Sequence, residues 1–343
     1  MSGQKLYVVD IESLFIIFDI VMRILITGGA GYIGSHCVAL SLERGHDVMV
    51  FDNLSTGHRE MVDGRAKFFP GDITKPIEIR EAISDYRPDI VMHFAAKCVI
   101  PDSMARPAYY WEQNVGGTIN ILRAMVDSGV DKMVFSSSVA VYGDPLEIPI
   151  QETTGLCPIS PYGTTKIACE RAIADVGGSG AIRYVNLRYF NVAGAGMGLG
   201  CMTDNETRLI PLTVKAALGK VDSIVVFGDD YSTRDGSCIR DFIHVMDIAE
   251  GHHAAMEYLE NGGESETINL GTGEGYSVFE IIEKVREILQ KPFKVDISAR
   301  RDGDTPVVVA SKGKAWSLLR WKPERDLEKI LRSTIEWEKR NIV

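Results

Sequence analysis

Paired cysteines and metal-binding clusters are missing from this sequence of 343 residues. Its cysteines are scattered, with no Cys-x-x-Cys pair and no cluster of Cys and His at metal-ligand spacing. This distribution excludes the disulfide framework of a small secreted domain, and it predicts reduced thiols, a cytoplasmic location and no bound metal. The six cysteines are Cys37, Cys98, Cys157, Cys169, Cys201 and Cys238.

Positive charge is also in short supply. The chain has 37 Lys and Arg against 47 Asp and Glu, which gives a formal net charge of -10 and a sequence pI near 5.3. An acidic surface repels DNA, RNA and anionic lipid, so we expect no nucleic-acid partner and no membrane partner. Any phosphate-binding site must therefore depend on a local group of basic residues.

The N-terminal apolar stretch is too short to span a membrane. Residues 13–18 are preceded by Asp10 and Glu12 and followed by Asp19. A membrane-spanning helix needs ~20 apolar residues. The stretch also lacks the basic region and the small-residue cleavage site of a signal peptide. Met22 stands just before the first predicted strand and resembles an alternative start, so residues 1–21 are treated as an extension of unknown role.

Short β-branched runs alternate with longer helical patterns from Arg23 to about Leu187. This alternation predicts an α/β fold with a Rossmann-type doubly wound parallel sheet at residues 22–190. Beyond it, glycine-rich loops, shorter helices and isolated strands predict a smaller C-terminal α/β lobe at residues 191–343. The predicted strands are Arg23–Thr27, Asp47–Phe51, Lys67–Pro70, Asp89–His93, Lys132–Phe135 and Arg183–Leu187.

A glycine-rich turn follows the first predicted strand. Gly28 permits a tight turn, Gly31 lets the backbone approach a pyrophosphate, and Gly34 lets the next helix pack against the sheet. The N-terminus of that helix supplies N–H donors for the phosphates. Three glycines alone are weak evidence, but their position between a strand and a helix favours a dinucleotide site over a purely structural turn.

The second predicted strand leads directly into Asp52, 18 residues beyond Gly34, where a carboxylate can bind the ribose 2′-OH of a dinucleotide. It would repel the extra phosphate of NADP, and no arginine follows until Arg59. We therefore predict NAD as the cofactor and residues 22–190 as the NAD-binding domain. Asp72, after the third strand, has two open interpretations, as an acceptor for the adenine amine or as a turn residue.

Among the 12 tyrosines, only Tyr162 has a lysine four residues later, Lys166. This spacing puts both side chains on one face of a helix. The ammonium and the positive charge of a nicotinamide are expected to lower the pKa of the tyrosine from ~10 toward about 7, where it can take and return a proton. We expect the preceding serines, 136–138, to form a loop that presents hydroxyls at the carboxyl edge of the sheet.

Three strings together resemble a known family: residues 27–36 (TGGAGYIGSH), 187–191 (LRYFN) and 240–247 (RDFIHVMD). With the serine triplet and the Tyr-x-x-x-Lys pair, they are similar to the extended short-chain dehydrogenases/reductases, and in particular to their UDP-galactose (UDP-glucose) 4-epimerases. The resemblance extends over residues 22–343. Such long strings are specific to nucleotide-sugar epimerases.

The resemblance implies an NAD-dependent isomerase that interconverts UDP-glucose and UDP-galactose. In this family, bound NAD takes the C4 hydride while the tyrosine removes the O4 proton, and the 4-keto sugar turns over before the bound NADH returns the hydride. The family pattern makes Tyr162 the base, lets Lys166 hold the nicotinamide ribose and tune the tyrosine, and lets Ser138 hydrogen-bond to O4. Residues 191–343 would then be mainly a nucleotide-sugar substrate domain.

The resemblance also implies the residues that contact each ligand. Two arginines facing a diphosphate make chemical sense, because guanidinium groups bind phosphate with paired hydrogen bonds. The implied substrate contacts are Ser138, Asn191, Arg240, Arg301 and Asp304. The implied NAD contacts are Gly28, Gly31, Tyr32, Ile33, Gly34, Asp52, Asn53, Asp72, Ile73, Phe94, Ala95, Ala96, Asn114, Ser136, Tyr162, Lys166 and Tyr189.

Several positions depart from the patterns of related enzymes. Relatives that dehydrate or decarboxylate nucleotide sugars carry a carboxylic acid just beyond the serines, whereas this chain has Val139 and Ala140, which favours epimerisation. Cys98 replaces a lysine near the nucleotide, with Lys97 one step away. Arg208 stands where an asparagine is frequent.

Sugar choice stays open in the sequence. Val308 falls where some epimerases carry a large aromatic residue, so UDP-N-acetylglucosamine or UDP-xylose/UDP-arabinose are alternative substrates to UDP-glucose. An alternative of another class is a catalytically inactive NAD-sensing protein, against which the intact Tyr162, Lys166 and Ser138 argue.

The family usually pairs through two helices, which implies a homodimer. We assign these helices to Met104–Val126 and Tyr162–Asp175. Apolar residues of the first form a stripe that fits either a dimer interface or the core of one subunit. They are Tyr109, Trp111, Ile119, Leu122 and Met125.

Overall fold

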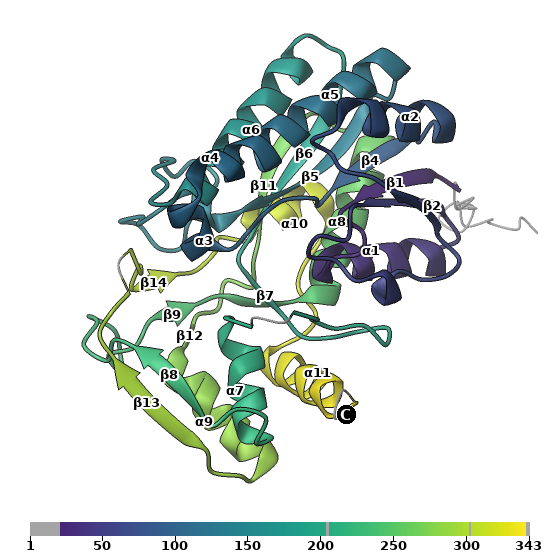
Figure 1. The fold of residues 1–343 in the computed structure, drawn as a ribbon. Coiled ribbons are helices and arrows are strands. Elements are labelled where there is room, and N and C mark those ends of the chain that lie inside the picture. Colours follow the sequence, from purple (N-terminus) through teal and green to yellow (C-terminus); the bar gives the residue numbers. More distant parts are fainter. Residues whose placement is uncertain (1–20, 204–205, 302, 341–343) are drawn as a thin grey trace, which may run out of the picture.

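The structure, a computed structural model, describes residues 21–203, 206–301 and 303–340 (Figure 1). The N-terminal extension, apart from residue 21, lies outside these ranges, as does its apolar stretch. The described residues form an α/β fold of two lobes, the larger of which is built on a seven-stranded parallel sheet. The predicted fold class is confirmed.

The strand order of the large sheet is β11-β6-β5-β4-β1-β2-β3, and every neighbouring pair is parallel. All six predicted strands are present, and β11 is a seventh that the sequence analysis did not predict. The strands are β1 (Arg23–Thr27), β2 (Asp47–Asp52), β3 (Lys67–Pro70), β4 (Ile90–His93), β5 (Lys132–Ser138), β6 (Arg183–Tyr189) and β11 (Glu266–Leu270).

The serine triplet lies inside β5, so its prediction as a loop is wrong. The ladder continues through the serines, and Ser138 pairs with Tyr189 at the end of β6. Buried hydroxyls are tolerated here because they find partners: Ser136 bonds to the hydroxyl of Tyr189, and Ser137 donates to Glu170. A strand thus presents these side chains more rigidly than a loop would.

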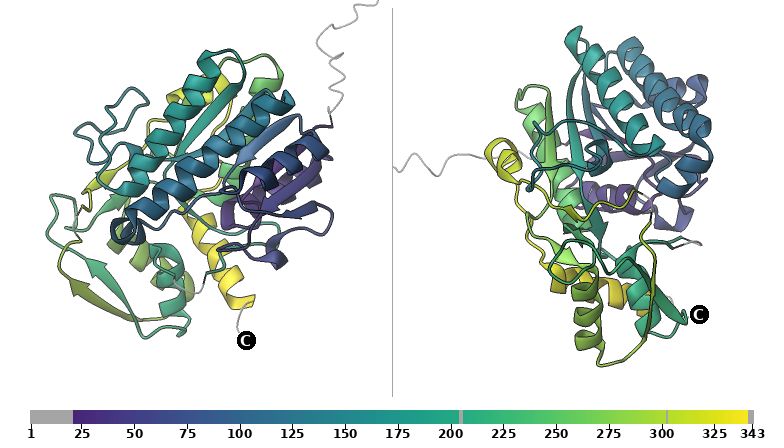
Figure 2. Two further views of the ribbon diagram at one scale, coloured as in Figure 1. Left: turned by 45° about the horizontal axis from the view of Figure 1, so that its top comes forward. Right: turned by 90° about the vertical axis from the view of Figure 1, so that its left-hand side faces the viewer.

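Helices cover both faces of the large sheet, as a doubly wound fold requires (Figures 1 and 2). Successive strand residues face opposite layers: Ile24 and Ile26 belong to one apolar core, and Leu25 belongs to the other. The first layer contains α1 (Tyr32–Glu43), α8 (Val245–Glu260) and α10 (Gly313–Leu319), and the second contains α2 (Pro76–Tyr86), α5 (Gly117–Ser128) and α6 (Pro161–Gly178).

The second lobe has its own apolar core, in which Val214, Val285 and Leu331 are fully buried. Its helices are α7 (Leu209–Ala217), α9 (Val278–Leu289) and α11 (Leu327–Arg340). Three small sheets belong to this half of the chain, with orders β10-β7, β12-β9-β14 and β13-β8. Their strands are β7 (Asn191–Ala193), β8 (Ser223–Phe227), β9 (Ile239–Arg240), β10 (Phe242–His244), β12 (Tyr276–Ser277), β13 (Lys294–Ser298) and β14 (Val307–Val308).

The chain does not stay in the second lobe after residue 191. Helix α8 returns to cover the large sheet beside α1, and β11 then pairs with β6 at the edge of that sheet (Figure 1). Residues from both halves of the sequence therefore build the larger lobe.

The predicted helix at Met104–Val126 is interrupted, and its assignment as one continuous helix is wrong. Arg106 leaves the helical conformation, with φ -132° and ψ 56°, because the following Pro107 disfavours a helical residue before it. The segments are α3 (Ile100–Ala105), α4 (Pro107–Tyr110), a π-helical turn η3 (Trp111–Gly116) and then α5. Two short 3-10 turns, η2 (Arg59–Met61) and η4 (Val139–Val141), complete the elements.

The apolar stripe of this region divides between core and surface. Leu122 and Met125 are buried against the large sheet, whereas Trp111 and Ile119 are each 42% exposed. The second predicted dimer helix is present as α6 and is longer than expected. Among the described helices, none combines the length and apolar character that crossing a bilayer demands.

Five histidines are buried in the described part of the chain. Burial lowers the pKa of each because the charged ring loses its hydration: to about 4 in His36 and His252, to about 3 in His93 and His244, and well below the ordinary value in His253. His93 is held neutral between the hydroxyls of two threonines. These rings make folding sensitive to acid.

We expect the free energy of unfolding to fall as pH drops below about 6.5, the ordinary histidine pKa. Above that pH the histidines are neutral in both states; below it the unfolded chain binds protons that the folded protein does not bind until pH reaches about 3 to 4. Each such histidine lowers stability by about 1.4 kcal/mol per pH unit. Urea unfolding from about pH 7.5 to about pH 5.5 measures the slope. A free energy constant over that range would contradict this account, and His253→Gln should make the decline shallower.

Candidate functional site

The candidate site lies at the carboxyl edge of the large sheet, where the strand order reverses. The chain runs outward from β1 through β2 and β3 on one side and through β4, β5 and β6 on the other. Ligands of open α/β sheets bind at such a switch point, outside the carboxyl ends of the strands. The predicted dinucleotide and catalytic residues follow these strand ends.

The glycine turn after β1 has the geometry of a phosphate cradle. Gly28 has a positive φ of 74°, and a Cβ on it would lie 2.5 Å from the backbone nitrogen of Ala95. A Cβ on Gly34 would lie 2.3 Å from the carbonyl oxygen of Gly28, so only glycine lets α1 approach the turn this closely. Helix α1 begins at Tyr32 with no side-chain cap, which leaves the N–H groups of its first turn available to an anion. The residues of this turn fit a dinucleotide.

Asp52 holds the next loop beside the turn. Its carboxylate accepts hydrogen bonds from the backbone nitrogens of Ala30 at 3.0 Å and Leu54 at 2.8 Å. Burial raises the pKa of Asp52, while those two bonds and the charge of Lys97 oppose the rise. Its placement next to the glycine turn is the one that the sequence analysis expects for a ribose-binding carboxylate.

Asn53 and Asp72 lie together at the ends of β2 and β3. The Asn53 amide donates to one carboxylate oxygen of Asp72 at 3.0 Å. The other oxygen accepts from the backbone nitrogen and the hydroxyl of Thr74, at 2.8 Å and 2.7 Å. Asp72 therefore does serve as a turn residue, and contact with an adenine stays a prediction. Ile73, next in sequence, is buried in the layer of α2 and α5.

Residues after β4 border the turn on its other side. Ala95 contacts Gly28, and the ring of Phe94 lies 4.5 Å from that of the buried His252 on α8. Ala96 follows in the same loop. Asn114, in the π-helical turn, is buried and hydrogen-bonds to both backbone polar groups of Lys97 and to Thr165 of α6. It thus ties this loop to the helix that carries Tyr162 and Lys166.

Tyr162 and Ser138 lie together at the end of β5. Tyr162 is in the first turn of α6, which Ser160 caps by accepting from the Gly163 nitrogen at 3.2 Å. Burial raises the pKa of Tyr162, and its hydrogen bond with Ser138 opposes the rise. This direction is opposite to the lowered pKa expected when a nicotinamide charge is present. The groups of the chain alone therefore keep the tyrosine protonated.

Lys166 lies one helical turn further along α6 and is buried. Its ammonium donates to the carbonyl oxygen of Ser136 at 2.7 Å and lies 6.0 Å from the centre of the Tyr162 ring. Burial lowers its pKa. The hydroxyl of Ser136 bonds in turn to that of Tyr189. The structure thus brings together Tyr162, Lys166, Ser136, Ser138 and Tyr189.

Sequence reasoning missed a buried ion pair behind these residues. Glu170, on α6, accepts from the Nε of Arg188 at 2.9 Å, and Arg188 also donates to the Tyr142 hydroxyl at 2.9 Å. Glu170 and Arg188 are 6% and 5% exposed. The only signal in the sequence was the spacing of Tyr162, Lys166 and Glu170 at four-residue steps on one helix face.

All the predicted substrate residues except Ser138, which ends β5 in the larger lobe, gather in the second lobe. Arg240, on β9, pairs with Asp304 at 3.5 Å, and the Asp304 nitrogen donates to the Arg301 carbonyl oxygen at 3.2 Å. The exposed Arg301 guanidinium stacks on the ring of Phe227 at 3.7 Å. Asn191 begins β7 and donates to the Asp241 carbonyl oxygen, next to Arg240. Two guanidinium groups thus share one region.

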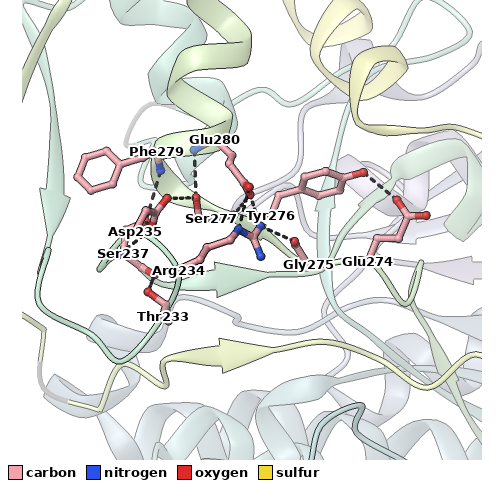
Figure 3. A network of polar contacts seen from close by, with 10 residues as sticks. All are labelled: Thr233, Arg234, Asp235, Ser237, Glu274, Gly275, Tyr276, Ser277, Phe279 and Glu280. Atoms are coloured by element: carbon pink, nitrogen blue, oxygen red, sulfur yellow. Dashed lines mark hydrogen bonds and ion pairs between the residues drawn. The ribbon is translucent and has the colours of Figure 1, made fainter.

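A polar network holds the strand of Arg240 in place (Figure 3). Tyr276 of β12 pairs with Arg240 of β9, and Ser277 caps α9 through a capping box with Glu280. Ser277 also donates to Asp235, which accepts from the backbone and hydroxyl of Ser237. Remaining members of the network are Thr233, Arg234, Glu274, Gly275 and Phe279.

Asp241 is a second residue that sequence reasoning missed. Its carboxylate, fully buried, accepts from the backbone nitrogens of Thr272, Gly273 and Ala310 at 2.9 Å, 2.9 Å and 3.1 Å. Burial raises its pKa and these bonds oppose the rise. Asp241 therefore joins the end of β11 to the strands of the second lobe.

Four of the positions that depart from relatives can be placed in the structure: Val308, Val139, Ala140 and Arg208. Val308 packs with Val141 and Phe190 in one apolar cluster near the end of β5. Val139 and Ala140 follow Ser138 as the short turn η4. The Arg208 guanidinium lies 5.5 Å from the ring of Tyr32. Among the described residues, no group of His, Cys, Asp and Glu could hold a metal ion.

Residues 24–271 match the NAD dependent epimerase/dehydratase family. The chain belongs to this family. It is 44% identical over 317 residues to the UDP-glucose 4-epimerase of Rhizobium leguminosarum bv. trifolii. The aligned segment covers 92% of this chain and 96% of the relative. The family assignment confirms the predicted resemblance to nucleotide-sugar epimerases.

Solved structures of 4-epimerases are similar over nearly the whole chain. UDP-glucose 4-epimerase from Brucella ovis, in complex with NAD, superposes with a TM-score of 0.89 at 41% identity and covers 92% of this chain and 98% of its own. The UDP-Glc/GlcNAc 4-epimerase of Campylobacter jejuni gives 0.82 at 38% identity, covering 93% and 99%. Because the matched family is NAD dependent, the predicted cofactor, NAD, is confirmed.

Proposed function

We propose that this protein is an NAD-dependent 4-epimerase that interconverts UDP-glucose and UDP-galactose. The observation that supports it most is that Ser138, Tyr162 and Lys166 lie together at the carboxyl edge of the sheet, the same edge at which the glycine turn follows β1. Their neighbours Val139 and Ala140 offer no carboxylic acid to assist elimination. The names of the similar enzymes in Rhizobium and Brucella support the same activity.

Each catalytic side chain has a distinct task in this proposal. NAD, when bound, supplies a hydride acceptor at C4 and a positive charge beside the tyrosine. Tyr162 then takes the proton from the sugar O4 and returns it at the end of the cycle, while Ser138 holds that oxygen by a hydrogen bond. Lys166, fixed on the Ser136 carbonyl oxygen, places a second positive charge near the phenolate.

The two lobes divide the ligands between them. We propose that residues 22–190 bind NAD through the glycine turn, Asp52 and the other predicted contacts. Residues 191–343, mainly, would hold the nucleotide sugar, with Arg240 and Arg301 at the diphosphate. Asp304 orients Arg240, and Asn191 lies beside it. In this proposal the 4-keto sugar rotates in the space between the lobes.

A second candidate is 4-epimerisation of another UDP-sugar. Val308 has a small side chain in the apolar cluster next to η4, where bulk would crowd a substituent of the sugar. The Campylobacter relative is titled a UDP-Glc/GlcNAc 4-epimerase, and a relative from Stenotrophomonas maltophilia was solved with formylated UDP-arabinopyranose. UDP-N-acetylglucosamine and UDP-xylose/UDP-arabinose are therefore the substrates to compare.

A substrate panel tests the proposed activity. The purified protein is incubated separately with UDP-galactose, UDP-N-acetylgalactosamine, UDP-glucuronate and UDP-arabinose, and the products are identified by NMR. Formation of UDP-glucose at the highest kcat/KM is the expected result. Faster conversion of an N-acetylated sugar would favour the second candidate. Bound NAD without turnover of any sugar would instead indicate an NAD-sensing protein.

We further propose that the protein is a cytoplasmic homodimer. Trp111, Ile119 and Val126 are each more than two-fifths exposed on the helical segment that runs from η3 into α5. Apolar side chains in a row on one surface favour self-association. We expect sedimentation equilibrium at micromolar concentration to give twice the chain mass of 37.8 kDa. A monomer under these conditions would contradict the proposed homodimer.

A further inference from the structure

Helix α6 is fastened to the end of β5 at three points, one for each of three consecutive serines. The partners on α6 stand at four-residue steps, so they share one face of the helix. The three pairs are Tyr162 with the Ser138 hydroxyl, Lys166 with the Ser136 carbonyl oxygen at 2.7 Å, and Glu170 with the Ser137 hydroxyl. The position of this face of α6 on the sheet therefore depends on these contacts (Figure 1).

Two of the three contacts involve groups that change during the proposed reaction. Tyr162 loses and regains a proton, so its hydrogen bond with Ser138 changes in each cycle. The Lys166 ammonium is attracted more strongly to the tyrosine oxygen whenever that oxygen is charged. The bond between Ser137 and Glu170 involves neither the sugar nor the transferred proton. It can therefore hold the helix in one place while the other two contacts change.

Glu170 is fixed to the neighbouring strand as well. Arg188 of β6 is the register partner of Ser137 of β5, so both side chains point to the same face of the sheet. The Nε of Arg188 donates to Glu170 at 2.9 Å. Ser137, Glu170 and Arg188 are only 1%, 6% and 5% exposed, so water cannot readily replace these bonds. One buried carboxylate thus ties α6 to two adjacent strands.

The arginine is itself held by further hydrogen bonds. Arg188 donates to the Tyr142 hydroxyl at 2.9 Å, and that hydroxyl donates to the side-chain oxygen of Asn269 at 2.7 Å. Asn269 lies on β11 and is fully buried. The network behind Glu170 therefore extends across β6 to the edge strand, which makes it a part of the sheet to which α6 can be fixed.

We propose that Ser137 and Glu170 are positioning residues for the epimerisation: their hydrogen bond fixes α6 on β5, so that Tyr162 and Lys166 keep one separation while the proton moves. This rests on the proposed function, because it assumes that Tyr162 is the base. Ser137 and Glu170 act only through Tyr162 and Lys166. Without the bond, α6 is free to shift along β5. A longer distance between the ammonium and the phenolate then raises the pKa of Tyr162.

The Ser137→Ala variant tests this role, because it removes one hydroxyl and keeps the ion pair of Glu170. We expect kcat to fall about 10-fold with KM within about 2-fold of the parent, since a misplacement of about 1 Å can cost about 100-fold in rate. The acid limb of the kcat profile should move to higher pH. Ultraviolet titration of each protein against its Tyr162→Phe form measures the pKa of Tyr162 without turnover.

Ser41→Ala is the matched control. The Ser41 hydroxyl is fully buried and donates to the Cys37 carbonyl oxygen at 2.7 Å within α1, in the opposite layer. Both alanine variants should lose stability in urea unfolding, but only Ser137→Ala should change kcat and the pH profile. Ser137→Thr keeps the hydroxyl and should restore most of the lost rate.

Three results would overturn the positioning role. They are a parental kcat and pH profile in Ser137→Ala, an equal loss of kcat in Ser41→Ala, and a Ser137→Thr variant of parental stability that is as slow as Ser137→Ala. Failure of the parent to turn over any UDP-sugar would instead refute the proposed function. The ultraviolet titration would still measure whether the pKa of Tyr162 depends on Ser137.

Discussion

Replacing Tyr162 by phenylalanine is expected to lower kcat for UDP-galactose by about 10³-fold, the range of an effective general acid–base group. The substitution removes one hydroxyl from the first turn of α6 and keeps the ring that fills its buried position. NAD should stay bound, because the variant keeps the glycine turn and Lys166. Steady-state kinetics and the NAD released on denaturation measure the two effects separately.

Tyr258→Phe is the matched control for this substitution. Tyr258 lies on α8, at the far end of the larger lobe from the proposed site, and its loss of a hydroxyl should leave kcat within about 2-fold of the parent. Turnover by Tyr162→Phe at more than about one-tenth of the parental rate would refute the assigned base. A pH profile adds a further check, since the parental rate should depend on deprotonation of a group that the variant lacks.

Replacing Arg188 by methionine is expected to lower the free energy of unfolding by about 3–5 kcal/mol. The substitution leaves the Glu170 carboxylate buried, 6% exposed, without its guanidinium partner. It also removes the hydrogen bond to the Tyr142 hydroxyl. Urea unfolding followed by circular dichroism gives the difference in free energy.

The double variant Arg188→Met with Glu170→Leu distinguishes a broken ion pair from lost packing. Removal of both charges leaves no isolated carboxylate, so we expect the double variant to recover at least about half of the stability that the single variant loses. A double variant as unstable as Arg188→Met would show that packing, and not the unpaired charge, causes the loss.

The sequence predicts the larger lobe well because its strands are buried on both faces. Runs such as that of β1, in which Ile24, Leu25 and Ile26 are all fully buried, stand out as continuous apolar segments. Strand β11 gives no such signal, since its first two residues, Glu266 and Thr267, are polar and half-buried. The serines of β5 caused the opposite error, since their polar side chains predicted a loop. Hydrogen-bond partners from distant residues make these side chains compatible with a buried strand.

The candidate site also contains residues that the sequence predicts and residues that only the folded structure reveals. Gly28, Asp52, Tyr162 and Lys166 could be predicted because their chemistry depends on spacing within one short segment. The hydrogen-bond partners of Asp241 lie more than thirty positions away from it in the sequence, so no local pattern predicts its role. The protonation preference of Tyr162 was also beyond reach, because it depends on how deeply the folded chain buries the ring.

The late position of β11 has a consequence for synthesis on the ribosome. When the first six strands have emerged, the outer edge of β6 still has unpaired backbone groups, and its partner lies about eighty residues further along the chain. The nascent sheet must therefore wait, with an open edge, until the first elements of the second lobe and helix α8 have been made. A pause or a premature stop in that interval would expose an aggregation-prone strand, which gives a chaperone a defined segment to protect.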